Sequence, residues 1–199
     1  ILTELFSKTT YKLSKKDLNK FAKEVIRDKS AQFPCLHKYK NVKLVENRES
    51  WQNEMFTATR NNREVFIKSR KIRPMTIFQQ RRLEKEIRLG KLASEKGLGP
   101  KIYNIFFCYD KNKTAKLYIV YQKINSGSLR DWLQKNKLKI KHKKKIKKLI
   151  NKLYKNNIIP GYISENNILV ETDSNDDTGV RFYFNNFKNS YSVKDLIQE

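Results

Sequence analysis

The stretch EMFTATRNNREVFIKS, residues 54–69, decides the fold prediction. Two runs rich in β-branched and aromatic residues, Glu54 to Thr59 and Glu64 to Ser69, flank the polar segment Arg60-Asn61-Asn62-Arg63. Two such runs joined by a short polar segment are typical of a β-hairpin. We therefore expect two adjacent antiparallel strands at this point of the chain.

The neighbouring segments extend this hairpin into a larger unit. A strand is expected from Lys40 to Val45, after a turn near Phe33-Pro34. A helix is expected from about Ile77 to Lys96, because Pro74 precedes it and Gly97-Leu98-Gly99-Pro100 must end it. Two strands then follow, Lys101 to Tyr109 and Ala115 to Ile124. The expected order is three strands, a helix and two strands.

The rest of the chain predicts helices and one more hairpin. Apolar spacing predicts an amphipathic helix near the start, from Ser14 to Ile26, and a short helix begins at Leu129. A long helix is expected from His142 to Asn156, with one apolar face and a basic patch of Lys143, Lys144, Lys145, Lys147, Lys148 and Lys152. Strands at Ile168 to Glu171 and Val180 to Phe184 enclose an Asp-rich loop.

That Asp-rich loop, residues 172–179, has the acidic character of a calcium site but not its pattern. A calcium loop requires Gly at its sixth position and Glu at its twelfth, where this chain has Thr178 and Phe184. We interpret the loop as a solvated turn.

Composition limits the classes of protein to consider. The chain has 199 residues, with 44 Lys+Arg against 20 Asp+Glu and a formal charge of +24, and 38% of its residues are hydrophobic. This is enough apolar material for one folded domain or two small lobes. No apolar run approaches the roughly 18 residues of a membrane span. The first residues lack the layout of a secretory signal, and we expect that this chain was excised from a longer precursor.

The charge indicates no single partner. A strongly positive surface attracts nucleic acid, anionic lipid or acidic protein, while AT-rich genomes raise Lys and Asn content without any such role. The residues Cys35 and Cys108 make no disulfide framework, and with His37 and His142 they give no zinc-ligand spacing. We expect a reducing compartment and no structural metal.

Four motifs, spread over about residues 40–190, resemble those of the protein kinase family. Val65-Phe66-Ile67-Lys68 is similar to the segment whose lysine holds the nucleotide phosphates, and Glu86 corresponds to the helix carboxylate that pairs with this lysine. Leu117 to Leu129 resembles the fifth strand and the hinge, with Tyr121 as gatekeeper. The resemblance implies a Lys68–Glu86 ion pair beside a nucleotide site.

The other two motifs lie in the second half and lack catalytic groups. Ile158 to Val170 resembles the catalytic loop, but Tyr162 takes the place of the base-positioning Asp, while Asn167, a metal ligand in the family, is kept. Asn186 stands where the family has the Mg²⁺-binding Asp. Tyrosine, with a reference pKa of about 10, is a poor proton acceptor at neutral pH.

The first lobe departs from the family as well. Its expected phosphate-binding loop, Asn47 to Met55, has no glycine, because all six glycines of the chain lie at Gly90 or later. Phe66 replaces the alanine that lies against adenine in the family, and its ring would fill that slot. We therefore expect binding of ATP and Mg²⁺ to be absent or weak, with no other cofactor.

These observations predict an α+β, kinase-like bilobal fold with a β-rich N-lobe and a truncated, mainly helical C-lobe. The expected division is an N-terminal helical extension at 1–39, an N-lobe at 40–124 and a minimal C-lobe at 125–199.

The predicted function is that of a catalytically inactive pseudokinase, a scaffold or allosteric regulator that binds a protein such as an active kinase or its substrate. The composition resembles that of short kinase relatives in large DNA viruses or intracellular pathogens. We expect a cytoplasmic location, which for a viral or effector protein is the cytoplasm of the host. A nuclear location stays open as an alternative. Two alternatives stay open: weak phosphotransfer that uses Asn167 and Asn186, and electrostatic binding of nucleic acid or anionic membrane by the lysines of 135–155.

Overall fold

The computed structural model describes residues 33–48, 53–71, 77–109 and 115–192. The helix expected from Ser14 to Ile26 and part of the expected glycine-free loop lie outside these residues. Within them, no helix is long and apolar enough to cross a membrane.

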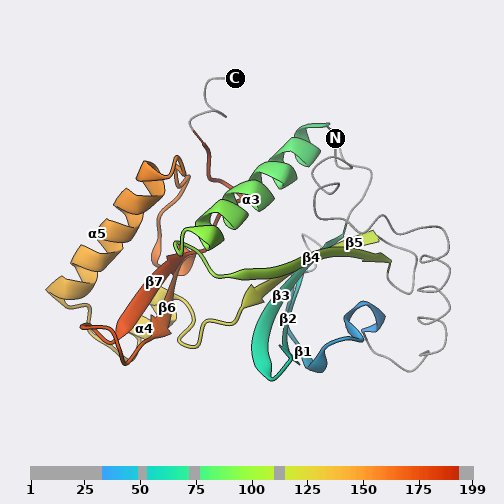
Figure 1. The fold of residues 1–199 in the computed structure, drawn as a ribbon, viewed down its shortest axis with the longest axis horizontal. Helices are drawn as coiled ribbons and strands as arrows, with labels where there is room; N and C mark the ends of the chain where they lie inside the picture. The colour runs from blue at the N-terminus through green and yellow to red at the C-terminus, as the bar shows by residue number, and fades with distance from the viewer. Residues whose placement is uncertain (1–32, 49–52, 72–76, 110–114, 193–199) are drawn as a thin grey trace.

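The first half is a five-stranded antiparallel sheet (Figure 1). Its strands are β1 (Lys40–Arg48), β2 (Asn53–Arg60), β3 (Arg63–Lys71), β4 (Ile102–Tyr109) and β5 (Ala115–Gln122). They lie in the order β1-β2-β3-β5-β4, and α3 (Ile77–Glu95) connects β3 to β4. The expected order of three strands, a helix and two strands is confirmed, with boundaries that differ by up to three residues.

The hairpin that decided the prediction has a two-residue turn. Arg60 pairs with Arg63, and between them Asn61 and Asn62 have φ angles of 50° and 59°. Two successive positive φ angles match the right-handed twist of the flanking strands, and asparagine tolerates this region better than most residues. The local sequence therefore fixes the register of β2 against β3.

The two faces of this sheet are covered by different parts of the chain. Alternate residues of β3, Val65 and Ile67, join a core with Phe56 of β2 and Tyr118 and Val120 of β5. The opposite face packs on α3 through a smaller cluster of Leu83, Ile87, Leu117 and Ile119. The odd and even positions of β3 are thus separated, as strand geometry requires, and Phe66 and Lys68 belong to the α3 side.

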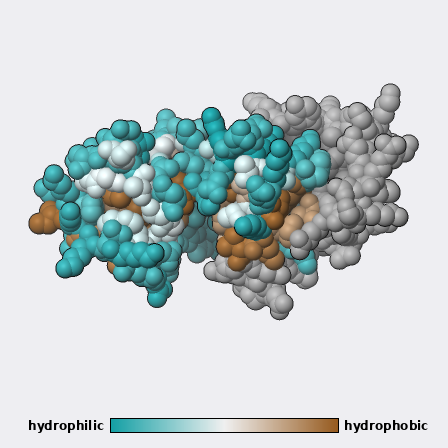
Figure 2. Space-filling model, turned by 90° about the horizontal axis from the view of Figure 1, so that it is seen from below, coloured by the Kyte–Doolittle hydropathy of each residue, from teal (hydrophilic) through white to brown (hydrophobic). Residues whose placement is uncertain are grey.

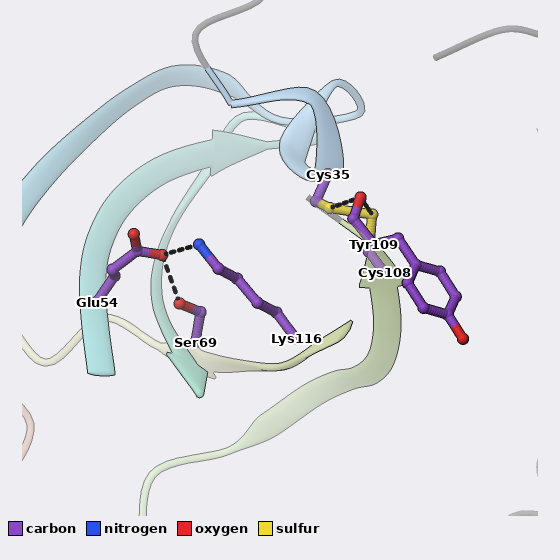
Figure 3. The surroundings of a disulfide bond; sticks show 6 residues. All are labelled: Cys35, Glu54, Ser69, Cys108, Tyr109 and Lys116. Carbon is purple, nitrogen blue, oxygen red and sulfur yellow. Dashed lines mark hydrogen bonds and ion pairs between the residues drawn. A yellow bond between two sulfur atoms is a disulfide. The ribbon is translucent and has the colours of Figure 1, made fainter. Parts of the chain in front are cut away.

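The short 3₁₀ helix η1 (Pro34–Leu36) is joined to β4 by a disulfide between Cys35 and Cys108 (Figure 3). The two Cα atoms lie 5.8 Å apart, although the cysteines are 73 positions apart in sequence. The sequence indicated no disulfide between these cysteines, and this bond corrects that expectation. Sequence gave no local signal for it, because only the packing of η1 on the sheet brings the two residues together.

A buried polar group lies on the same side of the sheet. Glu54 of β2 accepts hydrogen bonds from the Lys116 ammonium of β5 at 2.8 Å and from the Ser69 hydroxyl of β3 at 2.9 Å (Figure 3). The residues Lys116 and Ser69 are only 8% and 1% exposed. The carboxylate therefore joins three neighbouring strands and supplies the charge that a buried ammonium needs.

The second half contains α4 (Leu129–Leu133), α5 (Ile140–Lys155), the 3₁₀ helix η3 (Glu165–Asn167), β6 (Ile168–Thr172) and β7 (Val180–Phe184). The strands β6 and β7 form the expected antiparallel hairpin. Leu149 and Leu153 of α5 pack on Val170 and Phe182 of this hairpin. Leu89 and Ala93 of α3 belong to the same core, so α3 contacts both halves of the molecule (Figure 1).

The predicted fold class is wrong in its second half. A mainly helical C-lobe was expected, but residues 125–192 hold one long helix, one five-residue helix and a two-stranded sheet, followed by extended chain. The alternating apolar residues of 168–184 and the Asp- and Gly-containing turn between them favour a hairpin. The helical lobe came from the family resemblance and not from these residues.

The extended chain after β7 returns to pair with the segment before η3. Ile159 and Tyr191 form an isolated antiparallel bridge, and the backbone oxygen of Asn189 lies only 1.6 Å from where a Cβ on Gly161 would be. Glycine is therefore required at this close approach. Arg82 of α3 donates to the Asn189 side chain at 2.7 Å, which ties this pair of segments to the first half.

Candidate functional site

The residues of the expected nucleotide site lie on the α3 side of the five-stranded sheet. Phe66 of β3 lies directly opposite Tyr121 of β5. The ammonium nitrogen of Lys68 lies 5.6 Å from the centroid of the Tyr121 ring, within the range of a cation–π contact. The structure thus brings these three positions together, and the lysine that the resemblance assigns to phosphate contacts an aromatic ring of the protein.

Glu86 of α3 forms its ion pair with Arg70, two positions after Lys68 on β3. An Arg70 guanidinium nitrogen lies 3.2 Å from the Glu86 Oε2 atom, and the two side chains are 28% and 18% exposed. Oε2 is buried and accepts no hydrogen bond of good geometry among the described residues, so the contact is mainly electrostatic. The expected Lys68–Glu86 ion pair is not among those of the described residues.

The Tyr121 hydroxyl stays protonated in this setting. Burial raises its pKa well above the usual value, and the nearby Glu86 carboxylate raises it further, while Arg70 acts in the opposite direction. A tyrosine in this state donates a hydrogen bond but does not act as a base at neutral pH.

The expected hinge contacts the second half of the molecule. Gln122 donates from its amide to Glu171 of β6 at 2.8 Å, and Tyr183 of β7 donates to the same carboxylate at 2.6 Å. Burial and the hydrogen bond to Glu171 raise the pKa of Tyr183 to about 12. The end of β5 is thus fixed to the β6–β7 hairpin by side-chain hydrogen bonds.

The expected catalytic-loop positions take part in local hydrogen bonds to backbone carbonyls. Tyr162 is 65% exposed, and its backbone carbonyl accepts a hydrogen bond of 3.2 Å from the Asn167 side-chain amide. The backbone carbonyl of Asn186 accepts from the Ser190 hydroxyl at 2.8 Å. The Asn167 side-chain amide therefore closes the loop on its own backbone.

The aspartates of the loop between β6 and β7 are paired with cations. In the loop between β6 and β7, Asp176 and Asp177 both pair with Lys145 of α5, and Asp173 pairs with Arg181. The hydrogen bond from Lys145, followed by that from Thr178, lowers the pKa of Asp176 far below its usual value. Across the residues that the structure describes, no group of three or more His, Cys, Asp or Glu side chains could hold a metal ion.

Five of the six lysines of the predicted basic patch are exposed on α5. The exposed members are Lys143, Lys144, Lys147, Lys148 and Lys152. Lys145 is instead half-buried against the β6–β7 loop. The helix itself contains no acidic residue, and the half of the molecule that holds it is mainly hydrophilic on the face seen in Figure 2.

Two cavities lined by described residues lie in or beside the second half, and neither is lined by Lys68, Glu86, Phe66 or Tyr121. The first, of about 420 Å³, lies between the α4–α5 loop and the β6–β7 turn. The second, of about 410 Å³, lies between the end of α3, the exposed lysines of α5 and β7. Sequence reasoning missed both, because their walls come from segments that are distant in the chain.

A comparison with protein-family models and with curated proteins found no match for this chain. The kinase resemblance therefore rests on the motifs quoted above.

Proposed function

We propose that this protein is a non-catalytic, degenerate relative of the protein kinases, without the helical second lobe, that acts by binding another protein as a scaffold or regulator. A regulated kinase or its substrate is the proposed class of partner. Binding of ATP and Mg²⁺ is absent or weak in this proposal.

The observation that carries the proposal is the contact between the Lys68 ammonium and the Tyr121 ring, 5.6 Å from its centroid. A nucleotide-binding lysine must leave its ammonium available to phosphate oxygens. The nearby Glu86 is held by Arg70 instead, so the lysine–carboxylate clamp of the family is replaced by contacts within the protein. Tyr162 and Asn186 add no carboxylate for a base or for Mg²⁺.

The edge strand β4 supports a protein partner. Tyr103, Phe107 and Tyr109 of β4 are 43%, 41% and 63% exposed. Exposed aromatic side chains are enriched at protein interfaces, and an edge strand offers backbone groups to an added strand. This edge is the surface we assign to the partner.

The absence of phosphotransfer is tested with labelled ATP and Mg²⁺ at high protein concentration. We expect no label on the protein or on a general acceptor protein. Incorporation that disappears in a Lys68→Met variant would overturn the proposal, whereas incorporation that persists in this variant would identify a contaminating kinase.

The assigned surface is tested by quantitative affinity purification of partners with matched variants. Replacing Tyr103 and Tyr109 by serine should reduce the recovery of a specific partner at least tenfold. Replacing Tyr154 by serine is the control, because this tyrosine is 48% exposed but lies on α5. Equal recovery with all three proteins contradicts the assignment of β4.

A second candidate function, electrostatic binding of nucleic acid or anionic membrane, is favoured by the five exposed lysines on α5. Tyr154 is the single aromatic side chain in that helix, which offers little base stacking. Binding of this kind should weaken steeply as salt rises and show little sequence preference. Affinity that does not change with salt removes this candidate.

The cytoplasmic location expected from the sequence is a separate proposal, and the Cys35–Cys108 disulfide opposes it. Disulfides persist mainly in oxidising compartments. To decide between a cytoplasmic location and an oxidising compartment, cells are lysed directly in a denaturant that contains a thiol-reactive maleimide, and the label on the two cysteines is measured. Modification of both cysteines supports a cytoplasmic location, and protection of both indicates an oxidising compartment.

A further inference from the structure

The cavity between the α4–α5 loop and the β6–β7 turn has the chemistry of an anion site. Its volume of about 420 Å³ is within the range of small-molecule pockets. The polar groups around it are two lysines, three hydroxyls, an amide and a histidine, and its lining contains neither Asp nor Glu. We propose that this cavity binds a phosphomonoester, with Lys137, Lys139 and His142 as the groups that hold the phosphate.

His142 provides a polar atom that is oriented by the fold. The residue is 5% exposed, and its ring packs edge-on against Trp132 at 5.3 Å and Phe182 at 6.3 Å between centroids. Its Nδ1 atom accepts a hydrogen bond of 3.2 Å from the Lys139 backbone N–H, which places the proton of the neutral ring on Nε2.

The second ring nitrogen of His142 is left for a ligand. No described residue supplies a hydrogen-bond acceptor to Nε2, and this atom is not among the fully enclosed polar atoms without a partner. His142 is one of the residues that line the cavity. A buried N–H donor at the wall of a basic pocket requires an acceptor, and a phosphate oxygen would supply one.

Charge around the cavity favours the same ligand. Lys137 and Lys139 are exposed at its rim, and α5, which spans 16 residues, begins immediately after Lys139 with no acidic residue in its first turn. The free backbone N–H groups of that turn add partial positive charge at the same place. The Asp176 carboxylate, which accepts a hydrogen bond from the lining residue Thr178, is paired with the ammonium of Lys145.

The remaining wall is suited to the organic part of an ester. The Trp132 side chain lines the cavity beside the hydroxyls of Ser126, Thr172 and Thr178. The hydroxyls of Ser126 and Thr172 bond to each other at 2.8 Å, so they form a fixed polar edge. An aromatic or apolar group attached to phosphate can therefore contact Trp132 while its phosphate meets the lysines.

The test uses the fluorescence of Trp132 in the full chain. The protein has two tryptophans, so a Trp51→Phe background leaves Trp132 as the reporter. Phenyl phosphate is titrated at constant ionic strength, with phenol as the uncharged control and calorimetry as the second readout. We expect saturable binding of phenyl phosphate and at least tenfold weaker binding of phenol.

Matched variants separate the pocket from general charge attraction. Replacing Lys137 and Lys139 by glutamine should weaken phenyl phosphate binding at least tenfold. Replacing Lys143 and Lys144 by glutamine removes the same charge from exposed sites of α5 outside the cavity and should change it less than twofold. All four lysines are exposed, so the variants are expected to fold, and circular dichroism checks this.

Equal weakening by both pairs, equal binding of phenol, or no binding of phenyl phosphate would each overturn the proposal. A short phosphotyrosine peptide, compared with phenyl phosphate, then identifies the source of the ester. Tighter binding of the peptide assigns the phosphate to a protein partner, and tighter binding of the free ester assigns it to a small molecule. None of these results depends on the absence of phosphotransfer, which is measured separately.

Discussion

Removing the Cys35–Cys108 disulfide should destabilise the protein without altering its folded structure. The bond closes a loop of 73 residues that includes most of the five-stranded sheet and α3. In the chain-entropy treatment, a loop of this length restricts the unfolded chain by about 4 kcal/mol at 25 °C. The folded state should tolerate serine at both positions, because both sulfur atoms lie 3.3–3.4 Å from the Tyr109 carbonyl oxygen, an acceptor for two hydroxyls.

The assay is urea denaturation of the oxidised protein and of a Cys35→Ser/Cys108→Ser variant, each with and without reductant. The variant should lose about 4 kcal/mol, equivalent to about 8–16 °C in melting temperature for a chain of this size, and should not respond to reductant. Reductant should bring the native sequence to the stability of the variant. Equal stability of variant and oxidised protein, or a mass that shows two free thiols after oxidative refolding, would refute the reasoning.

Three further predictions concern individual buried or paired contacts, most of them within one half of the molecule. Glu54→Ala should cost about 3 kcal/mol in urea denaturation, because it removes the carboxylate that the buried Lys116 ammonium contacts, whereas replacing both residues by leucine and methionine should restore most of the loss. Gly161→Ala should destabilise by about 3 kcal/mol, because its Cβ would collide with the backbone of Asn189. Gly90→Ala lies in a helix and would make only ordinary contacts at 3.5 Å, so it should stabilise by about 0.5–1 kcal/mol. The two variants should therefore shift the melting temperature in opposite directions, and shifts in the same direction contradict this reasoning. The lowered pKa of Asp176 means that its contribution to stability is present above its unfolded pKa of about 3.9 and is lost only as pH falls through the much lower folded value. Asp176→Asn should therefore lower the melting temperature at pH 7 and lower it clearly less at pH 2. An equal effect at both pH values contradicts this.

The local elements of the fold were predictable because their signals lie within short segments. Short runs of β-branched and aromatic residues between turns, such as those around Asn61-Asn62, predicted every described strand within a few residues. The glycines that end α3 and the spacing of apolar residues in α5 predicted the two long helices. The kinase-like second lobe was not predictable in this way. It was carried over from a resemblance, and the residues after Asn156 contain no helical periodicity to support it.

The candidate sites were harder to predict because they depend on long-range packing. Phe66, Lys68, Glu86 and Tyr121 lie in one region of the structure. Sequence order could not show that Arg70 and not Lys68 would pair with Glu86, because both cations lie on the same face of β3. The disulfide and the cavity beside His142 were missed for the same reason. Their residues are brought together by the packing of η1 and of the β6–β7 hairpin and carry no motif.

The most direct test of the proposed absence of nucleotide binding is a thermal-shift titration with Mg-ATP and with ATP alone. A ligand present at 100 times its dissociation constant stabilises by about 2.7 kcal/mol, which is about 5–10 °C for a chain of this size. We predict no saturable shift with up to millimolar nucleotide. A saturable shift that is lost in Lys68→Met would contradict the account.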